Sequence, residues 1–204
     1  MPKPYHHGDL RRVVLEAALE DVAESEAIPL NFNRLAKRIG VSHTAIYRHF
    51  PDKQSLIDAL ALHAFEALEE AVATAVARAG EDPRRRISAG LRAYIDVAVA
   101  RPVYLRLMFS GVTTDRAQAP DLKSAAGKAI GHLQHEIGVL AERGELPAES
   151  VVDATRVLWA STHGLAQLLA DSQLIGMVRT PAGVDHLVTL MLETLAGDGA
   201  GDKA

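Results

Sequence analysis

Contact with nucleic acid is the chemistry for which the residues between Asn31 and Lys53 are best suited. From Ala27 to Pro51 the chain carries three arginines and one lysine but no aspartate or glutamate. The whole chain has a formal net charge of -4, so this positive charge is local. A basic patch on an otherwise acidic protein suits the binding of phosphate groups by one face. The alternative is a run of solvated surface residues, which is the usual origin of a charge run.

Three side chains in this stretch carry the hydrogen-bonding groups needed to read DNA bases. His43 and Thr44 lie in the first turn of a predicted helix and Arg48 lies one turn later, so all three can point into a groove. Arg48 is suited to a bidentate contact with guanine. We expect Asn33 to add a contact with a base or a phosphate.

A helix-turn-helix is needed to position these side chains, and the sequence carries its signals. Apolar residues recur at helical spacing from Leu35 to Ile39, and Gly40 ends that helix. Ser42 is a predicted N-cap for a second helix that ends near Phe50. In this motif the second helix lies in the DNA major groove, so the stretch predicts a DNA-binding domain.

With these residues the chain resembles the TetR family of transcriptional regulators. The resemblance covers the order of helices along the whole chain, and its specific part is Leu30 to Leu60, with a Gly-Val-Ser turn. It implies that four residues of the second helix face bases and that Tyr47 and Lys53 contact phosphates. The predicted DNA-binding residues are Asn33, Arg34, Ser42, His43, Thr44, Ala45, Tyr47, Arg48 and Lys53.

Two of these positions leave alternatives open. Tyr47 could instead face the core with only its hydroxyl exposed. Arg34 stands where the family often has an acidic capping residue. Either the start of that helix is weaker for this reason, or Arg34 is free to bind a phosphate.

A narrower resemblance is to a TetR subgroup named for a Trp-His-Gly motif. Its residues are Tyr5 to Arg11 near the start of the chain, and Trp159, His163 and Gly164 near the end. Members of the family are typically homodimers that bind palindromic operators and release them when a small ligand enters the C-terminal domain. The resemblance implies the same partners here, namely a palindromic double-stranded DNA, a second copy of the chain and an unidentified small molecule.

The composition predicts an all-α protein of about nine helices, because helix formers dominate and alternation of β-branched residues is missing. We expect a three-helix helix-turn-helix domain at residues 1–51, a helical ligand-binding and dimerisation domain at 52–196, and a disordered tail at 197–204. A long helix, Lys53 to Ala79, should join the two domains. The chain has no cysteine, no long uncharged apolar run and no signal-peptide pattern, so we expect a cytoplasmic protein with no membrane contact.

Apolar residues on the last two predicted helices, near 149–172 and 181–196, indicate a dimer interface. The first of these helices is apolar over so wide an arc that it should be buried on two sides, one in its own subunit and one against a partner. A four-helix interface would result. The alternative is the core of a monomer. The predicted interface residues are Leu165, Leu169, Val184, Leu187, Val188, Met191 and Leu195.

Aromatic and methionine side chains of the C-terminal domain predict a ligand pocket that is mainly apolar with a few polar groups. The predicted lining residues are Tyr94, Tyr104, Leu107, Met108, Phe109, Leu133, Trp159 and His163. Each of them could instead be an ordinary core residue. A histidine among apolar neighbours, such as His163, needs a hydrogen-bond partner, which either the protein or a ligand could supply.

Catalytic and metal chemistry are not favoured by the sequence. His132, His135 and Glu136 lie within one helical turn and could hold zinc or nickel, but their order is not a known zinc-enzyme pattern. No nucleophile elbow, P-loop or dinucleotide fingerprint is present. We therefore predict a ligand-released repressor with no metal, cofactor or enzymatic activity. The alternatives are a DNA-binding protein that senses no ligand and an all-helical enzyme with a histidine-centred site.

Overall fold

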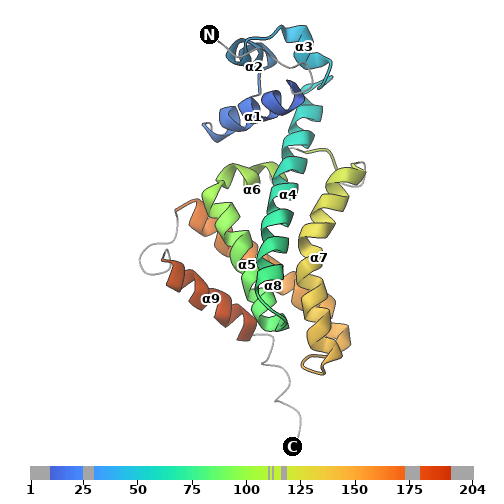
Figure 1. Ribbon diagram of the computed structural model, residues 1–204, viewed down its shortest axis with the longest axis vertical. Coiled ribbons are helices and arrows are strands. Elements are labelled where there is room, and N and C mark those ends of the chain that lie inside the picture. Colours follow the sequence, from blue (N-terminus) through green and yellow to red (C-terminus); the bar gives the residue numbers. More distant parts are fainter. Residues whose placement is uncertain are drawn as a thin grey trace, which may run out of the picture. The chain divides into compact units, whose positions relative to one another are not determined.

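Apolar residues at helical spacing, separated by glycines and prolines, form nine α-helices in the part of the chain that the structure describes. The computed structural model describes residues 10–24, 30–109, 111, 113–115, 119–172 and 180–193. These residues contain no β-strand, and the predicted all-α fold is confirmed. The helices are α1 (Leu10–Ala23), α2 (Phe32–Ile39), α3 (His43–Tyr47), α4 (Lys53–Arg78), α5 (Pro83–Ala100), α6 (Pro102–Phe109), α7 (Pro120–Glu142), α8 (Val151–Ala170) and α9 (Pro181–Glu193), with a 3-10 turn η1 (Ala148–Ser150) before α8 (Figure 1).

Local capping signals explain several of the helix ends. Asp82 caps α5 by accepting a hydrogen bond from the Arg84 N–H at 3.0 Å, and Pro83 occupies the first helical position. The helix expected near 149–172 is divided instead, because η1 takes its first turn and α8 begins at Val151. The expected disordered tail at 197–204 lies outside the described residues. None of the described helices is both long enough and apolar enough to span a membrane.

The helices form two compact units, and each unit is built from two segments of the chain. The first contains the described residues of 1–64 and 103–122, and the second contains those of 65–102 and 123–204. The sequence-based boundary at residue 51 differs from this division. Residues 52–64 and 103–122 group with α1, α2 and α3, so a segment distant in sequence belongs to the helix-turn-helix unit.

The first unit combines an apolar core with polar contacts that hold its second segment. α1, α2 and α3 pack against one another, and Leu35 and Ile46 are fully buried among them. Arg106 of α6 donates a hydrogen bond to the Val22 carbonyl at 2.8 Å, which satisfies a free acceptor in the last turn of α1. The Asp58 carboxylate of α4 accepts hydrogen bonds from Thr114, at 2.8 Å from its backbone nitrogen and 2.6 Å from its hydroxyl. These contacts hold the segment after α5 at two places.

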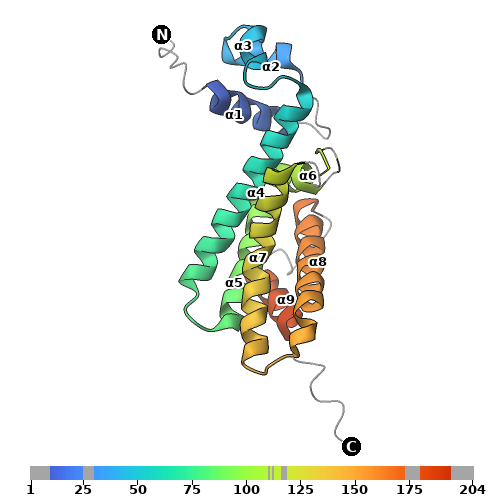
Figure 2. The same ribbon diagram turned by 90° about the vertical axis from the view of Figure 1, so that its right-hand side faces the viewer.

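The second unit is centred on α5, which packs against α8 and α9. Figure 2 shows α9 beside α8, and the two helices are also in contact. Ile95 of α5, Leu158 of α8 and Val188 of α9 are buried in this core. The guanidinium of Arg92 binds the Pro181 carbonyl at 3.1 Å and also pairs with Asp185, so the start of α9 is fastened to α5.

A partly buried hydrogen bond joins α5 to α8. The Tyr94 hydroxyl and the Nδ1 atom of His163 are 2.8 Å apart, and Tyr94 is 8% exposed. The Trp159 ring stacks on the His163 ring at a centroid distance of 5.9 Å. Burial raises the pKa of the Tyr94 hydroxyl and lowers the pKa of His163. Both groups are therefore neutral near pH 7.

The lowered pKa of His163 predicts that stability decreases in acid. Where the unfolded chain already binds a proton at this position and the folded chain does not, the free energy of unfolding falls with falling pH. Stability should be complete above the ordinary histidine pKa of about 6.5 and should decline below it. One titrating group can change the free energy of unfolding by at most about 1.4 kcal/mol per pH unit.

Urea denaturation between pH 5 and pH 8 measures this effect. We expect His163→Gln, which cannot titrate but retains hydrogen-bonding groups, to flatten the decline. The matched change His186→Gln, at an exposed position on α9, should leave the profile as it is in the native sequence. Identical profiles for the native protein and His163→Gln would contradict the prediction.

Candidate nucleic-acid interface

The helix-turn-helix is defined by three residues with separate roles. The Asn31 side chain caps α2 by accepting hydrogen bonds from the N–H groups of Asn33 at 2.9 Å and Arg34 at 3.2 Å. Gly40 ends α2 with φ 71°, in the left-handed region that glycine occupies at little cost. The Ser42 hydroxyl then accepts a hydrogen bond from the Ala45 N–H at 3.2 Å and caps α3. Ser42 is thus held in the turn as an N-cap.

α3 is shorter than the sequence predicts, since it ends at Tyr47 and not near Phe50. The N–H groups of His49 and Phe50 both donate to the Ile46 carbonyl at 2.9 Å, which closes the helix. Pro51 follows and disfavours a helical conformation at Phe50. Ile46 and Phe50 are 0% and 1% exposed and anchor α3 in the core of the first unit.

The opposite side of α3 is exposed and carries the predicted base-reading groups. His43, Thr44 and Arg48 are all exposed, and Ala45 is half-buried. Positions 43, 44, 47 and 48 fall on one face of a helix because they are spaced by one and four residues. The structure therefore brings the predicted base-reading side chains together on one surface.

Four predicted contact residues line one hollow beside this face. It has a volume of about 210 Å³, and its lining residues are Leu30, Asn31, Phe32, Asn33, His43, Tyr47 and Lys53. The Tyr47 ring packs edge-on against Phe32 and His43, at centroid distances of 4.9 and 4.6 Å. Tyr47 is 42% exposed, so its ring lies at the surface and is not a core side chain.

The cations of α2 are divided between internal ion pairs and solvent. Arg34 donates from Nε to the Asp21 carboxylate at 3.0 Å, and Arg38 donates to the same carboxylate at 2.7 Å. Asp21 is 4% exposed, and its hydrogen bond raises the pKa of Arg38. Arg34 is therefore paired within the unit, because the buried carboxylate of α1 needs a partner. Its contact with DNA stays a prediction.

Four cations of the first unit have no carboxylate partner among the described residues. Arg48 and Lys53 are two that the sequence singled out. The other two are Lys37 and Arg11, which are not among the contact residues predicted from the sequence. All four side chains are exposed. The only sequence signal for them was their positive charge, and Arg34 and Arg38 carried the same signal.

The start of α4 uses its own side chains to satisfy part of its backbone. The Asp52 carboxylate accepts a hydrogen bond from the Ser55 N–H at 2.7 Å, and the Ser55 hydroxyl lies 3.3 Å from the Asp52 nitrogen. This reciprocal capping occupies one of the backbone donors that the start of a helix offers to a phosphate. The exposed side chain of Lys53 is thus the clearer candidate for a phosphate contact there.

The predicted dimer residues are mostly buried within the chain itself. Leu165, Leu169, Val184 and Val188 are each less than 9% exposed, and Leu187 and Met191 are half-buried. Leu195 lies outside the described residues. The four buried residues therefore belong to the core of their own unit. The large apolar residues exposed on the last two described helices are Val152, Val157, Leu168 and Leu190.

The predicted pocket residues fall in both units. Tyr104, Leu107, Met108 and Phe109 belong to the first, where the Tyr104 hydroxyl is 3.3 Å from the Nε2 atom of His63. The second unit contains the others, namely Tyr94, Leu133, Trp159 and His163.

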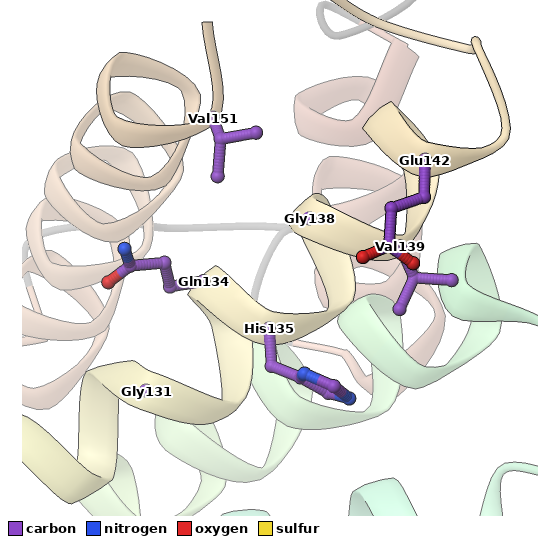
Figure 3. A pocket seen from close by; sticks show the side chains of 7 residues that line it. All are labelled: Gly131, Gln134, His135, Gly138, Val139, Glu142 and Val151. Carbon is purple, nitrogen blue, oxygen red and sulfur yellow. The ribbon is translucent and has the colours of Figure 1, made fainter. Parts of the chain in front are cut away.

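A different hollow is present on the surface of the second unit (Figure 3). It has a volume of about 440 Å³ and is lined by Gly131, Gln134, His135, Gly138, Val139, Glu142 and Val151. Gln134 and His135 leave α7 toward different sides. None of the predicted pocket residues lines this hollow.

The residues of the conceivable metal site are directed to separate partners. His132 lies 3.0 Å from a Glu69 carboxylate oxygen of α4, whereas the buried Glu136 pairs with Arg86 of α5 at 3.1 Å. His135 is exposed. Within the described residues, no group of three potential ligands is placed to hold a metal ion.

Two family models match this chain. The model described as bacterial regulatory proteins, tetR family, matches residues 14–60, which include the helix-turn-helix. The model described as tetracyclin repressor-like, C-terminal domain, matches residues 87–195, which is more than half of the chain. The second description does not name the Trp-His-Gly subgroup, which stays a prediction.

Relatives and solved structures agree with this assignment. The nucleoid occlusion factor SlmA of Vibrio campbellii is 35% identical over 174 residues, which cover 82% of this chain and 79% of that protein. The structure of a protein with unknown function from Rhodococcus sp. RHA1 is 32% identical, with a TM-score of 0.81 over 96% of this chain and 97% of that one. A TetR family transcription regulator from Marinobacter aquaeolei VT8 shares the fold, with a TM-score of 0.69 at 18% identity over 92% of this chain and 96% of that one. The chain therefore belongs to the TetR family of bacterial transcriptional regulators.

Proposed function

We propose that the protein is a one-component repressor, which binds a palindromic operator as a homodimer and leaves it when a small, mainly apolar ligand binds. The observation that carries the proposal is the exposed face of α3. On it, His43, Thr44 and Arg48 lie together, beside a hollow that Tyr47 and Lys53 help to line. This surface offers base-reading donors and phosphate-binding groups side by side.

The contacts divide into two kinds. Arg48 is exposed and has no carboxylate partner in the described residues, so its two parallel donors are available for a guanine edge. Thr44 and Ala45 can add contacts with a neighbouring base, including a thymine methyl group. The Tyr47 hydroxyl and the Lys53 ammonium suit phosphate oxygens on either side of the groove.

We place the dimer interface on the exposed face of α8 together with Leu190 of α9. Val157, Ser161, Gly164 and Leu168 recur at spacings of three and four residues and form one stripe on α8. Val157 and Leu168 are 57% and 45% exposed. A Cβ atom on Gly164 would meet no other part of the described chain within 4 Å. The stripe thus suits close approach by the same helix of a second copy.

The proposal that a ligand releases the protein from DNA is based on the family. The residues that we propose to respond to the ligand are Tyr94, Trp159 and His163. They form a polar pair and an aromatic ring where α5 packs against α8. A ligand that competes for the Tyr94 to His163 hydrogen bond would change how α5 packs on α8. It can weaken DNA binding only if it binds the DNA-free state more tightly.

A second candidate is a DNA-binding protein that senses no ligand. The observation in its favour is the 35% identity with a nucleoid occlusion factor over most of the chain. For this chain, the corresponding proposal is occupation of many chromosomal sites without control of the genes beside them. Both candidates use the same α3 surface. They differ in whether DNA binding controls the adjacent genes.

Selection of bound sequences from random duplexes tests the DNA-reading surface. We expect an inverted repeat with half-sites about 34 to 36 Å apart, or a multiple of that spacing. Arg48→Ala should cost about 1–3 kcal/mol on the selected site and relax one base position. Lys53→Ala should weaken binding to all sequences alike. If Arg48→Ala weakens operator and random DNA equally, Arg48 is not a base reader.

Sedimentation of a charged variant tests the dimer. Val157→Glu would bury an unpaired carboxylate against the partner, at a cost of about 3–5 kcal/mol, and should give a monomer with lost operator binding. Val99→Glu makes the same change at a position on α5 that is 46% exposed, and should leave the dimer intact. A dimer that survives Val157→Glu would move the interface away from this stripe.

Genome-wide mapping separates the two candidates. A repressor should occupy few sites, each within a promoter, and deletion of the gene should raise transcription from those promoters. Occupation of many sites with unchanged transcription of the adjacent genes would favour the second candidate.

A further inference from the structure

The guanidinium of Arg11 lies against the helix-turn-helix although Arg11 belongs to α1. Its Cζ atom is 5.4 Å from the centroid of the Phe50 ring, over the face of that ring. Phe50 is 1% exposed, so the ring is a fixed support. A guanidinium over an aromatic face is attracted by the ring electrons. This contact holds the charge of Arg11 in place while the side chain remains exposed.

No carboxylate neutralises Arg11 within the described residues. The neighbouring Arg12 is also exposed, but it pairs with Glu16 one turn further along α1. Arg34 and Arg38 are likewise engaged, with the carboxylate of Asp21. Arg11 thus shares with Lys53 the property of an accessible and unpaired positive charge.

Phe50 also links Arg11 to the proposed phosphate-binding surface. Phe50 closes the helix-turn-helix three residues before Lys53. The one carboxylate between these two positions is that of Asp52, and it already accepts a hydrogen bond from the Ser55 N–H at 2.7 Å. The positive charge of Arg11 is therefore held next to the segment that leads into α4.

We propose that Arg11 of α1 binds a backbone phosphate of the DNA. The inference rests on the proposed DNA-binding function. A planar guanidinium matches phosphate oxygens in two parallel hydrogen bonds. Because Phe50 already restrains the side chain, less conformational freedom is lost on binding. A phosphate contact carries no base information, so Arg11 raises affinity for operator and random DNA alike.

The test is the salt dependence of DNA affinity in Arg11→Met, which keeps an apolar stem on Phe50 and removes the charge. Loss of one phosphate contact should reduce the slope of log affinity against log salt by about 0.9. Affinity should fall roughly five- to tenfold near 0.1 M salt, on operator and random duplexes alike. Arg12→Met removes the same charge one residue away, and we expect it to leave the slope unchanged.

An unchanged slope in Arg11→Met overturns the inference. An equal change in Arg11→Met and Arg12→Met also overturns it, because the effect would then come from net charge alone. If Arg11→Met lowers the melting temperature, Arg11→Lys decides the question: a restored slope supports the phosphate contact, and an unrestored slope indicates a structural role. Failure of the native protein to bind any duplex would instead refute the proposed function.

Discussion

The Asp21 carboxylate lies inside the first unit with 4% exposure, where an unpaired negative charge would be costly. Arg34 and Arg38 supply the compensating charge from α2, and their hydrogen bonds fix the rotation of α2 on α1. The turn at Gly40 and the cap at Ser42 then determine where α3 begins. The direction of the exposed face of α3, which we propose to read DNA, therefore depends on a buried carboxylate of α1.

The same ion pairs decide which cations are available to a ligand. In the sequence, Arg34, Arg38, Arg48 and Lys53 are equivalent positive charges. In the fold, the first two form ion pairs with Asp21. The remaining charges lie on α3, at the start of α4 and elsewhere on the surface of the first unit. Internal pairing thus concentrates the accessible positive charge where a polyanion can meet it, without any change in net charge.

Sequence reasoning succeeded where one or two neighbouring residues carry the signal. Gly40 and Ser42 gave the turn, because caps act over a few residues. It failed where the outcome depends on packing. The partner of Arg34 is thirteen residues away on another helix. Likewise, helical periodicity identified the apolar arc of α8 but not which part of it is covered by its own subunit. Leu165 and Leu169, which the sequence places at a dimer interface, are buried within their own unit.

The contacts of Asp58 with Thr114 and of Arg106 with Val22 have a consequence for recombination between relatives. The helix-turn-helix unit is completed by a segment encoded far downstream of it. A chimera made by one crossover after residue 51 would combine α1 with a foreign α6, and one made after residue 64 would retain Asp58 without its Thr114. To exchange DNA specificity between family members, one would therefore have to transfer residues 103–122 together with the helix-turn-helix. The other route is to replace the few α3 side chains on an otherwise intact chain.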